Sequence, residues 1–560
     1  MSTRPTVLEW FEHHVETTPD RHYLTQPLGG GDANIKRWTF KEAYEEAGRM
    51  AAYLAAQGYP PKSQIAICSK NCAQWILADL AIWMAGHVSV PIFPTLTADT
   101  VKYILEHSET RLLFVGKLDP VWAEMKPGVP ADLPQVAFPL APESEQGLPQ
   151  WDALVAEQAA PIAERAKRDP AEMATIVYTS GSTGTPKGVM LSFGAMCDSA
   201  VGVKEFLGAE ARDRMLSYLP LAHAFERWAV ECQSYVSGCE LFFAESLDTF
   251  VADLRRAHPT LFISVPRLWL KFQQGVFKKM PPGKLSLFLA IPILSGIVKK
   301  KVLTGLGLDA VRFAGSGSAP IPGELIAWYR RLGLELLEGY GMSENFSYSH
   351  INRPGLVKVG TVGPPNPGVE CRLSDEGEVL VKSPGMMMGY YKEPEMTAEV
   401  LTDDGFLKTG DRGAIDPQQR LTLTGRVKEL FKTSKGKYVA PAPIENRVLN
   451  HPRIEACCVT GSGQPQPFAL VVLAEDARKA AGNGERDAID RELAEHLQAI
   501  NAGLDHHEHL QFLCVVKDVW LPENGFLTPT LKIKRAKLEE TYGPAVEGWY
   551  GQKKPVVWQS

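Results

Sequence analysis

The chain has 560 residues, of which 45% are hydrophobic, enough for three or four domain-sized units with separate cores. Its formal net charge is −6, so no strong overall field favours nucleic acid, and nucleic-acid binding is not expected. Nine cysteines, an odd number without paired metal-ligand spacing, argue against a disulfide framework and favour a reducing cytoplasm. The N-terminal residues lack an apolar core segment, so no signal peptide is expected.

The first 115 residues predict helices that alternate with short strands. One helix begins after Trp38, because Thr39 and Glu42 form a capping-box pattern, and it ends at Gly58. Strands are expected at 64–69, 88–93 and 111–115, and helices at 75–85 and 100–107. This alternation predicts an α/β fold with mostly parallel sheets covered by helices. The proline-rich residues 116–170 predict loops with one short helix.

The stretch from Ile176 to Gly188 combines three apolar strand-forming residues with a loop of serine, threonine and glycine. The loop positions are Thr179, Ser180, Gly181, Ser182, Thr183, Gly184 and Thr185. Hydroxyls, backbone N–H groups and the Lys187 ammonium together suit a polyphosphate, although the spacing is not that of a Walker loop. A helix is expected after the loop. A flexible Gly/Ser linker is the alternative.

The sequence T-S-G-S-T-G-T-P-K-G within this stretch closely resembles the phosphate-binding signature of the adenylate-forming (AMP-binding) enzymes, which include acyl-CoA synthetases. The resemblance implies a large N-terminal domain (1–425) with several subdomains and a small barrel-like region. A small, mobile α/β C-terminal domain (426–560) would follow a hinge near Lys428. Within it, strands are expected at 454–460, 468–474 and 512–516, and one helix carries Ile489, Leu493, Leu497 and Ile500 on a single face.

Two segments look like the long-chain branch of the acyl-CoA synthetases. In S-Y-L-P-L-A-H-A-F-E-R, the resemblance implies that His223 borders the carboxylate and the acyl-chain entrance; a purely structural histidine is the alternative. The segment L-F-I-S-V-P-R resembles the V-P-R element of the same branch, and an ordinary strand end with a surface Arg267 is its alternative.

Two further junctions of strand and tight loop, in 311–320 and 334–344, fit the carboxyl edge of a sheet, where open α/β folds bind ligands. The family resemblance implies adenine contacts from Ser318, Ala319, Gly339 and Tyr340. It also implies that Glu344, with Thr183, positions Mg²⁺ on the ATP phosphates. Ser343 stands where the family usually has threonine and keeps the hydroxyl.

The last motifs complete the family pattern. The resemblance assigns the ribose hydroxyls to Asp411 and Arg426, and the thiol substrate to the segment around Lys435 and Gly436. Lys532, followed by Arg535, resembles the catalytic lysine element, with Lys534 as the neighbouring alternative. Leu531 stands where many relatives have glycine, and the form T-P-T-L-K again looks like the long-chain branch.

The resemblance implies an AMP-forming acid–thiol ligase that uses ATP, Mg²⁺ and coenzyme A. A fatty acid of long or medium chain would be converted to an acyl-adenylate with release of pyrophosphate, and the acyl group would pass to CoA with release of AMP. Another acid, a carrier-protein thiol as acceptor, or an inactive paralogue that binds nucleotide or acyl groups are the alternatives. A homodimer also stays open.

An apolar segment at 285–298 lies between lysines. It is too short to span a bilayer, and Pro292 interrupts it. We expect a buried or groove-lining pair of helices; peripheral contact with the inner face of a membrane is the alternative.

Overall fold

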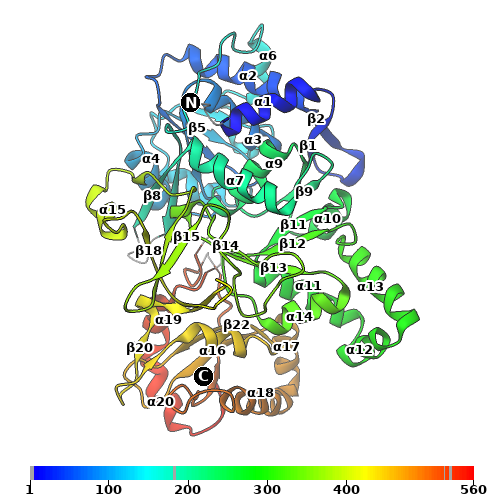
Figure 1. Ribbon diagram of the computed structural model, residues 1–560, viewed down its shortest axis with the longest axis vertical. Coiled ribbons are helices and arrows are strands. Elements are labelled where there is room, and N and C mark those ends of the chain that lie inside the picture. The colour runs from blue at the N-terminus through cyan, green and yellow to red at the C-terminus, as the bar shows by residue number, and fades with distance from the viewer. Residues whose placement is uncertain (1–4, 181–184, 522–523, 529–531, 560) are drawn as a thin grey trace.

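The computed structural model describes residues 5–180, 185–521, 524–528 and 532–559. A large N-terminal part lies above a smaller C-terminal part in Figure 1, and the chain passes between them near the short 3₁₀ turn Val427–Glu429. Helix α1 (Val7–Thr17) and helix α2 (Phe40–Ala56) both begin with capping boxes. In α2, Thr39 and Glu42 bond to each other's backbone N–H groups, which confirms the predicted helix start.

A seven-stranded sheet forms the centre of the N-terminal part, in the order β17-β8-β7-β4-β3-β5-β6. The strands are β3 (Gln64–Cys68), β4 (Val88–Ile92), β5 (Leu112–Val115), β6 (Gln135–Ala137), β7 (Met173–Ser180), β8 (Pro186–Ser192) and β17 (Gly389–Tyr390). Strands β3 to β7 run parallel, and helices α3 (Ala73–Met84) and α4 (Ala98–His107) connect them. The predicted α/β class is therefore confirmed.

The helix expected after the Gly-rich loop is present, but strand β8, which was not expected, comes before it. Strand β8 returns antiparallel to β7, with Thr179 opposite Lys187. Its buried residues Val189 and Leu191 alternate with the less buried Met190, as a half-buried strand requires. Helix α7 (Phe193–Leu207) begins only after Ser192, whose hydroxyl caps it.

Three four-stranded sheets complete the N-terminal part. One contains β2 (Ile35–Thr39), β1 (His22–Pro27), β10 (Glu240–Phe243) and β9 (Arg214–Ser217). The second contains β11 (Leu261–Ser264), β12 (Phe313–Ser316), β13 (Leu336–Tyr340) and β14 (His350–Ile351). The third is antiparallel and contains β15 (Glu370–Leu373), β16 (Glu378–Lys382), β18 (Leu407–Ile415) and β19 (Leu421–Arg426).

Residues 116–170 have more structure than the expected loops with one short helix. Strand β6 extends the central sheet, and the helices are α5 (Trp122–Met125) and α6 (Trp151–Glu157). Elements this short span too few residues to show a hydrophobic period, so the sequence could not reveal them.

The C-terminal part has its own sheet and core. Its strands are β22 (Ile454–Thr460), β23 (Phe468–Leu473), β24 (Leu513–Val515) and β25 (Val556–Trp558). Helices α16 (Pro441–Val448), α17 (Glu475–Ala480), α18 (Arg486–Asn501), α19 (Arg535–Tyr542) and α20 (Val546–Gly551) surround it. In α18 the four residues of the predicted apolar face are all buried, which confirms that face.

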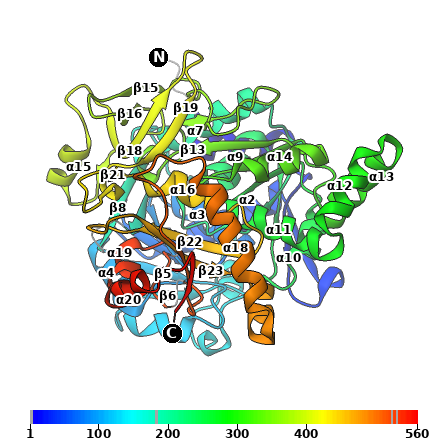
Figure 2. The ribbon, with the colours of Figure 1, turned by 90° about the horizontal axis from the view of Figure 1, so that it is seen from below.

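Helices α12 (Pro282–Ala290) and α13 (Pro292–Leu306) form a hairpin at the edge of the molecule in both views (Figures 1 and 2). The helix pair was expected, but its burial was only partly right: Leu285 is buried, whereas Ile293 is 82% exposed. Within the described residues, no helix combines the length and the apolar character needed to cross a bilayer.

Candidate active site

The phosphate-binding signature meets the predicted magnesium residue through one tyrosine. Strand β17 pairs with β8 and thereby brings Tyr390 beside Lys187, whose ammonium lies 5.2 Å from the centre of the ring. The Tyr390 hydroxyl donates a 2.8 Å hydrogen bond to the Glu344 carboxylate. Burial, and then the charge of Glu344, raise the pKa of Tyr390, so its hydroxyl stays protonated and can donate. One tyrosine thus holds a cation over its ring and a carboxylate at its hydroxyl.

The expected adenine residues lie at the carboxyl ends of two neighbouring parallel strands. Ser316 of β12 is paired with Glu338 of β13, so the loop that carries Ser318 lies beside the end of β13 that carries Gly339. Ser318 has a positive φ of 68°, an uncommon conformation for a residue with a side chain. Ala319 is exposed on the same loop.

Two close approaches fix the shape of this edge. A side chain at Gly317 would lie 3.1 Å from the Phe225 ring, so only glycine lets the two segments meet without displacement. The buried carboxyl of Glu338 accepts a 3.3 Å hydrogen bond from the backbone of Ile321, and burial raises its pKa to about 7. Glu338 therefore ties the β12 loop to β13.

The expected ribose residues form a hydrogen-bonded group of three. Asp411 accepts a 2.7 Å bond from the Tyr340 hydroxyl, and the Arg426 guanidinium lies 2.9 Å from its other oxygen. Strand pairing of β18 with β19 places Asp411 directly opposite Arg426. Each carboxylate oxygen has two lone pairs, so Asp411 keeps acceptor capacity for the hydroxyls of a sugar.

His223 is held as a neutral imidazole. Its Nδ1 accepts a 3.1 Å hydrogen bond from the Phe225 N–H, which places the remaining ring proton on Nε2. Burial, and then the charge of Lys532, lower the pKa of His223 to about 3. His223 can therefore donate a hydrogen bond from Nε2 at neutral pH without carrying a charge.

The residues next to His223 support the fold. Glu226 is buried and accepts hydrogen bonds from the Ser217 hydroxyl at 3.0 Å and from the Tyr218 backbone at 3.0 Å. Burial raises the pKa of Glu226 to about 8. Arg227 is fully buried in the core, where it pairs with Asp79. The histidine segment is thus attached to the core by its buried neighbours.

Lys532 belongs to the C-terminal part but approaches the nucleotide motifs. Desolvation, and then the charge of Arg426, lower its pKa, while Asp411 and Glu344 act in the opposite direction. The side chain keeps exposed surface although the surrounding protein desolvates its ammonium. The alternative, Lys534, is exposed and directly precedes α19.

Arg535 anchors the segment that carries Lys532. Its guanidinium lies 2.8 Å from the Glu445 carboxylate and donates a 2.6 Å hydrogen bond to the Val459 carbonyl. Within the lysine segment, the Lys532 N–H donates to the Thr528 hydroxyl at 3.0 Å. The catalytic candidate is therefore fixed to the sheet of the C-terminal part.

Some predicted residues stay apart from this cluster. Lys435 and Gly436 are exposed at the turn between β20 (Phe431–Lys432) and β21 (Tyr438–Val439). The turn bonds to the backbone of the C-terminal part, since the Ser434 N–H donates to the Gln464 carbonyl. In the phosphate loop, Thr185 is exposed and Ser180 ends β7, whereas Gly181, Ser182, Thr183 and Gly184 lie outside the described residues. Ser343, in the turn that also carries Glu344, is buried.

A magnesium ion fits these residues in one way. Mg²⁺ commonly takes one or two carboxylates and completes its shell with water and substrate phosphates, so Glu344 alone suits an ion that arrives with ATP. In the ranges that the structure describes, no group of three or more His, Cys, Asp or Glu residues could hold a metal.

Contacts between the two parts involve the V-P-R segment. Arg267, the second residue of α11 (Pro266–Lys279), forms an ion pair with Glu455 of β22. Gln274 donates to the Pro452 carbonyl at 3.3 Å, also across the boundary. Arg267 therefore follows the strand end as expected and contacts the C-terminal part through this ion pair. Sequence analysis missed both Glu455 and Tyr390; only the aromatic pair in G-Y-Y could have suggested the latter.

Comparison with known proteins identifies the class. Residues 11–391 match the AMP-binding enzyme family, and residues 429–554 match the AMP-binding enzyme C-terminal domain. The chain belongs to the AMP-binding enzyme family.

Relatives in other organisms cover nearly the whole chain. It is 31% identical to the long-chain-fatty-acid–CoA ligase FadD15 of Mycobacterium bovis, over 97% of this chain and 96% of that protein. Identity to the peroxisomal long chain acyl-CoA synthetase 6 of Arabidopsis thaliana is 30%, over 97% and 86%.

Solved structures share the fold. The adenylation domain of a carboxylate reductase from Mycobacterium chelonae superposes with a TM-score of 0.81 at 24% identity, covering 98% of this chain and 91% of that one. The corresponding domain from Segniliparus rugosus, determined with AMP and a co-purified carboxylic acid, gives 0.79 at 24% identity, with 98% and 94% covered.

Proposed function

We propose that the protein is an AMP-forming fatty acyl-CoA synthetase, an acid–thiol ligase that uses ATP, Mg²⁺ and CoA. The observation that carries this proposal is that Tyr390 joins Lys187 to Glu344 while Asp411 pairs with Tyr340 and Arg426. The charges of Arg426, Asp411 and Glu344 also act on the Lys532 ammonium. Names of full-length relatives support a long-chain fatty acid as substrate and CoA as acceptor.

In the first half-reaction a carboxylate oxygen attacks the α-phosphorus of ATP and pyrophosphate leaves. Both reactants are anionic, so electrostatic stabilisation dominates catalysis. We assign the attacking carboxylate and the α-phosphate to Lys532, and the departing pyrophosphate to Lys187. His223 would orient the carboxylate by donating from Nε2. Mg²⁺, held by Glu344 and the phosphates, would offset the negative charge of the leaving group.

Recognition of the nucleotide follows from the same assignment. Tyr340 would lie against adenine while its hydroxyl holds Asp411 for the ribose. Ser318, Ala319 and Gly339 would form the wall of the base site.

The second half-reaction transfers the acyl group to a thiol and releases AMP. We take Lys532 to act at the site in this arrangement, because the charges of Arg426, Asp411 and Glu344 act on its ammonium, whereas Lys435 and Gly436 are exposed. We infer that the C-terminal domain (426–560) rotates about a hinge near Lys428, which removes Lys532 and brings the Lys435 turn toward CoA. Hinge motions of this kind often limit turnover.

One assay tests the proposed reaction. AMP release would be measured with ATP and Mg²⁺ across fatty acids from acetate to oleate, each with and without CoA. We expect CoA-dependent turnover that peaks on long chains. Pyrophosphate exchange that depends on the acid, without any effect of CoA, would contradict the acceptor and point to a protein thiol.

A matched pair of variants tests the catalytic lysine. Removing one preorganised charge typically costs about 10²- to 10³-fold in rate, so Lys532→Met should slow pyrophosphate exchange by that amount. Lys534→Met removes an equal charge two residues away and should stay within about twofold of wild type. Equal losses in both variants would refute the assignment.

We further propose that the enzyme acts in the cytoplasm at the inner face of a membrane, where its fatty-acid substrate concentrates. A homodimer stays a prediction, which sedimentation equilibrium would test.

A further inference from the structure

The α12–α13 hairpin carries an unusual concentration of exposed apolar side chains. Five of the exposed large hydrophobic residues fall within eleven consecutive positions, and they are Leu287, Ile291, Ile293, Leu294 and Ile297. Ile293 is 82% exposed and Ile297 is 62% exposed. Apolar side chains gathered in this way on the surface mark a site of contact with another apolar phase.

The hairpin is nevertheless firmly attached to the protein. Leu285 and Leu306, at its two ends, are buried in the core formed with α10 (Phe250–Ala257) and α14 (Gly323–Leu332). Leu289, Val298, Val302 and Leu303 pack against the same core. The exposed residues therefore occupy the outer side of a fixed element.

The sequence of the hairpin and its flanks carries only positive charge. Residues 254–308 contain no Asp or Glu, although the whole chain has 65 acidic residues and a net charge of −6. The basic residues in this range are Arg255, Arg256, Arg267, Lys271, Lys278, Lys279, Lys284, Lys299, Lys300 and Lys301. Among the described residues, Lys299, Lys300 and Lys301 have no carboxylate within ion-pair distance.

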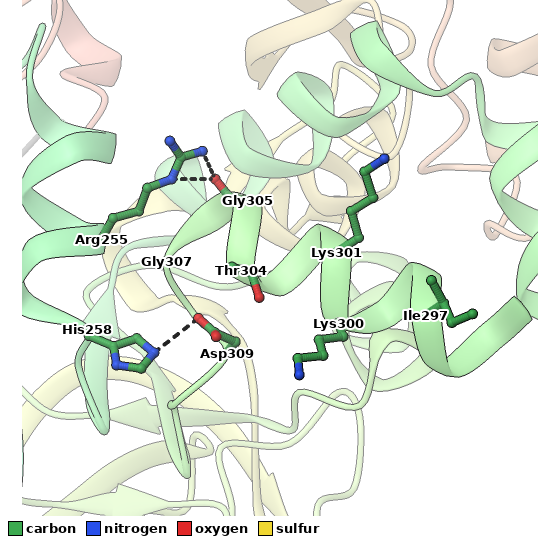
Figure 3. Close-up of a pocket in the computed structure, with 9 residues that line it drawn as sticks. All are labelled: Arg255, His258, Ile297, Lys300, Lys301, Thr304, Gly305, Gly307 and Asp309. Carbon is green, nitrogen blue, oxygen red and sulfur yellow. Dashed lines mark hydrogen bonds and ion pairs between the residues drawn. The ribbon is translucent and has the colours of Figure 1, made fainter.

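A basic hollow of about 810 Å³ lies at the foot of α13. Figure 3 shows Arg255 and His258 on one side of it, and Lys300, Lys301 and Ile297 on the other. Arg255 donates to the Gly305 carbonyl, and His258 lies 3.3 Å from Asp309, the one acidic residue in the lining. The hollow continues directly from the apolar face through Ile297.

The spacing along α13 fits the interface of a bilayer. Ile293 and Ile297 lie one turn apart toward the tip, and Lys300 follows at the foot. From Ile293 to Lys300 the helix rises about 10 Å, so Lys300 follows the two isoleucines on the same face about two turns from Ile293. Lysines at that level meet the headgroups, and their aliphatic stems extend along the apolar surface.

We propose that the α12–α13 hairpin docks the protein on an anionic lipid surface, with the apolar tip among the acyl chains and the basic hollow holding an acidic headgroup. Charge complementarity selects this occupant, because Lys299, Lys300 and Lys301, which have no ion-pair partner among the described residues, lie beside exposed isoleucines and match an anionic bilayer. The inference rests on the proposed membrane contact and is independent of acyl transfer.

Vesicle sedimentation with the full-length chain tests the proposal. We expect binding to vesicles of phosphatidylglycerol and phosphatidylcholine at about 0.1 M salt, and much weaker binding to phosphatidylcholine alone. The tip variant Ile293→Gln/Ile297→Gln should lose about tenfold in affinity per residue. The foot variant Lys299→Gln/Lys300→Gln/Lys301→Gln should lose about fivefold per lysine, only on anionic vesicles.

Matched controls change equal numbers of side chains elsewhere. Leu247→Gln/Leu356→Gln removes two other exposed apolar residues, and Lys62→Gln/Lys102→Gln/Lys479→Gln removes three other exposed lysines. Both controls should bind anionic vesicles within about twofold of wild type. Losses equal to those of the tip and foot variants would overturn the proposal.

Three other results would also overturn it. The first is that the wild type fails to bind anionic vesicles. The second is that inorganic phosphate competes with the vesicles while the tip variant still binds them as the wild type does. The third is that the tip variant binds normally and differs only in its oligomeric mass. AMP release from a water-soluble acid without vesicles should be unchanged in the tip and foot variants. This readout separates failure of the surface from failure of the proposed enzyme.

Discussion

Mutation of the ion pair between Arg267 and Glu455 is expected to change the position of the C-terminal domain. Replacing Arg267 by glutamine removes the charge that holds β22 against α11 and leaves the nucleotide-binding residues untouched. We expect Arg267→Gln to weaken the docked arrangement, in which Lys532 occupies the site, relative to the arrangement needed for thioester formation.

The exposure of the two side chains determines how much free energy the ion pair contributes. The Arg267 side chain is 26% exposed and that of Glu455 is 17% exposed. Exposed pairs contribute about 0–1 kcal/mol, whereas breaking a buried pair costs about 3–5 kcal/mol. A partly buried pair lies between these limits, at about 1.4 kcal/mol, which is a tenfold change in an equilibrium constant.

Separate assays of the two half-reactions measure this shift. Pyrophosphate exchange reports adenylation, and thioester formation from added acyl-adenylate and CoA reports the second step. The ratio of the second rate to the first should rise by up to about tenfold in Arg267→Gln and in Glu455→Gln. The double variant should add little to either, since both remove the contact across the boundary. Glu455→Gln also loses a 3.5 Å pair with Arg478, which lies within the C-terminal part.

Lys278 supplies the matched control. Its ammonium lies 4.0 Å from Asp476 across the same boundary, but the two side chains are 60% and 62% exposed. Lys278→Gln should therefore change the ratio by less than about twofold. A ratio that stays constant in Arg267→Gln, or a parallel fall of both rates, would refute the reasoning.

Three further predictions concern the site and the hinge. The pKa of Lys532 is lowered from the ordinary 10.5, and its charged form is needed, so pyrophosphate exchange should fall as the pH rises through that lowered pKa. Lys532→Arg, if active, should abolish this fall. The same fall of the rate at high pH in Lys532→Arg would contradict the role of the charge. Tyr390→Phe removes the 2.8 Å bond to Glu344 and should raise the Mg-ATP concentration for half-maximal rate about tenfold. The palmitate concentration for half-maximal rate serves as the control and should not change. Lys428→Pro should spare pyrophosphate exchange and impair thioester formation, and equal loss of both would exclude the hinge at this position.

Local patterns predicted those parts of the fold that short-range physics determines. The capping box of Thr39 and Glu42 and the buried face of α18 follow from neighbours three or four residues apart. Strand β8 escaped prediction because Pro186 and Gly188 suggested a loop, whereas pairing with β7 overrides that preference.

Contacts between distant residues account for what the sequence could not reveal. Arg267 and Glu455 are 188 positions apart, and only the docked C-terminal part brings them together. Tyr390 contacts Glu344 because β17 pairs with β8, and no local sequence pattern predicts this pairing. Likewise, hydrophobicity identified 285–298 as apolar but could not tell which of its faces the core would cover.

The attachment of Arg535 to Glu445 and Val459 has a consequence for the pace of catalysis. Lys532 lies three residues before this anchor, so its charge cannot withdraw as a free loop would, on a nanosecond to microsecond timescale. If the Lys532 charge must leave before a thiol enters, the whole C-terminal domain has to move in every catalytic cycle. The rate of turnover then depends on how fast the C-terminal domain rotates through the solvent, although the chemical step itself involves only a few atoms.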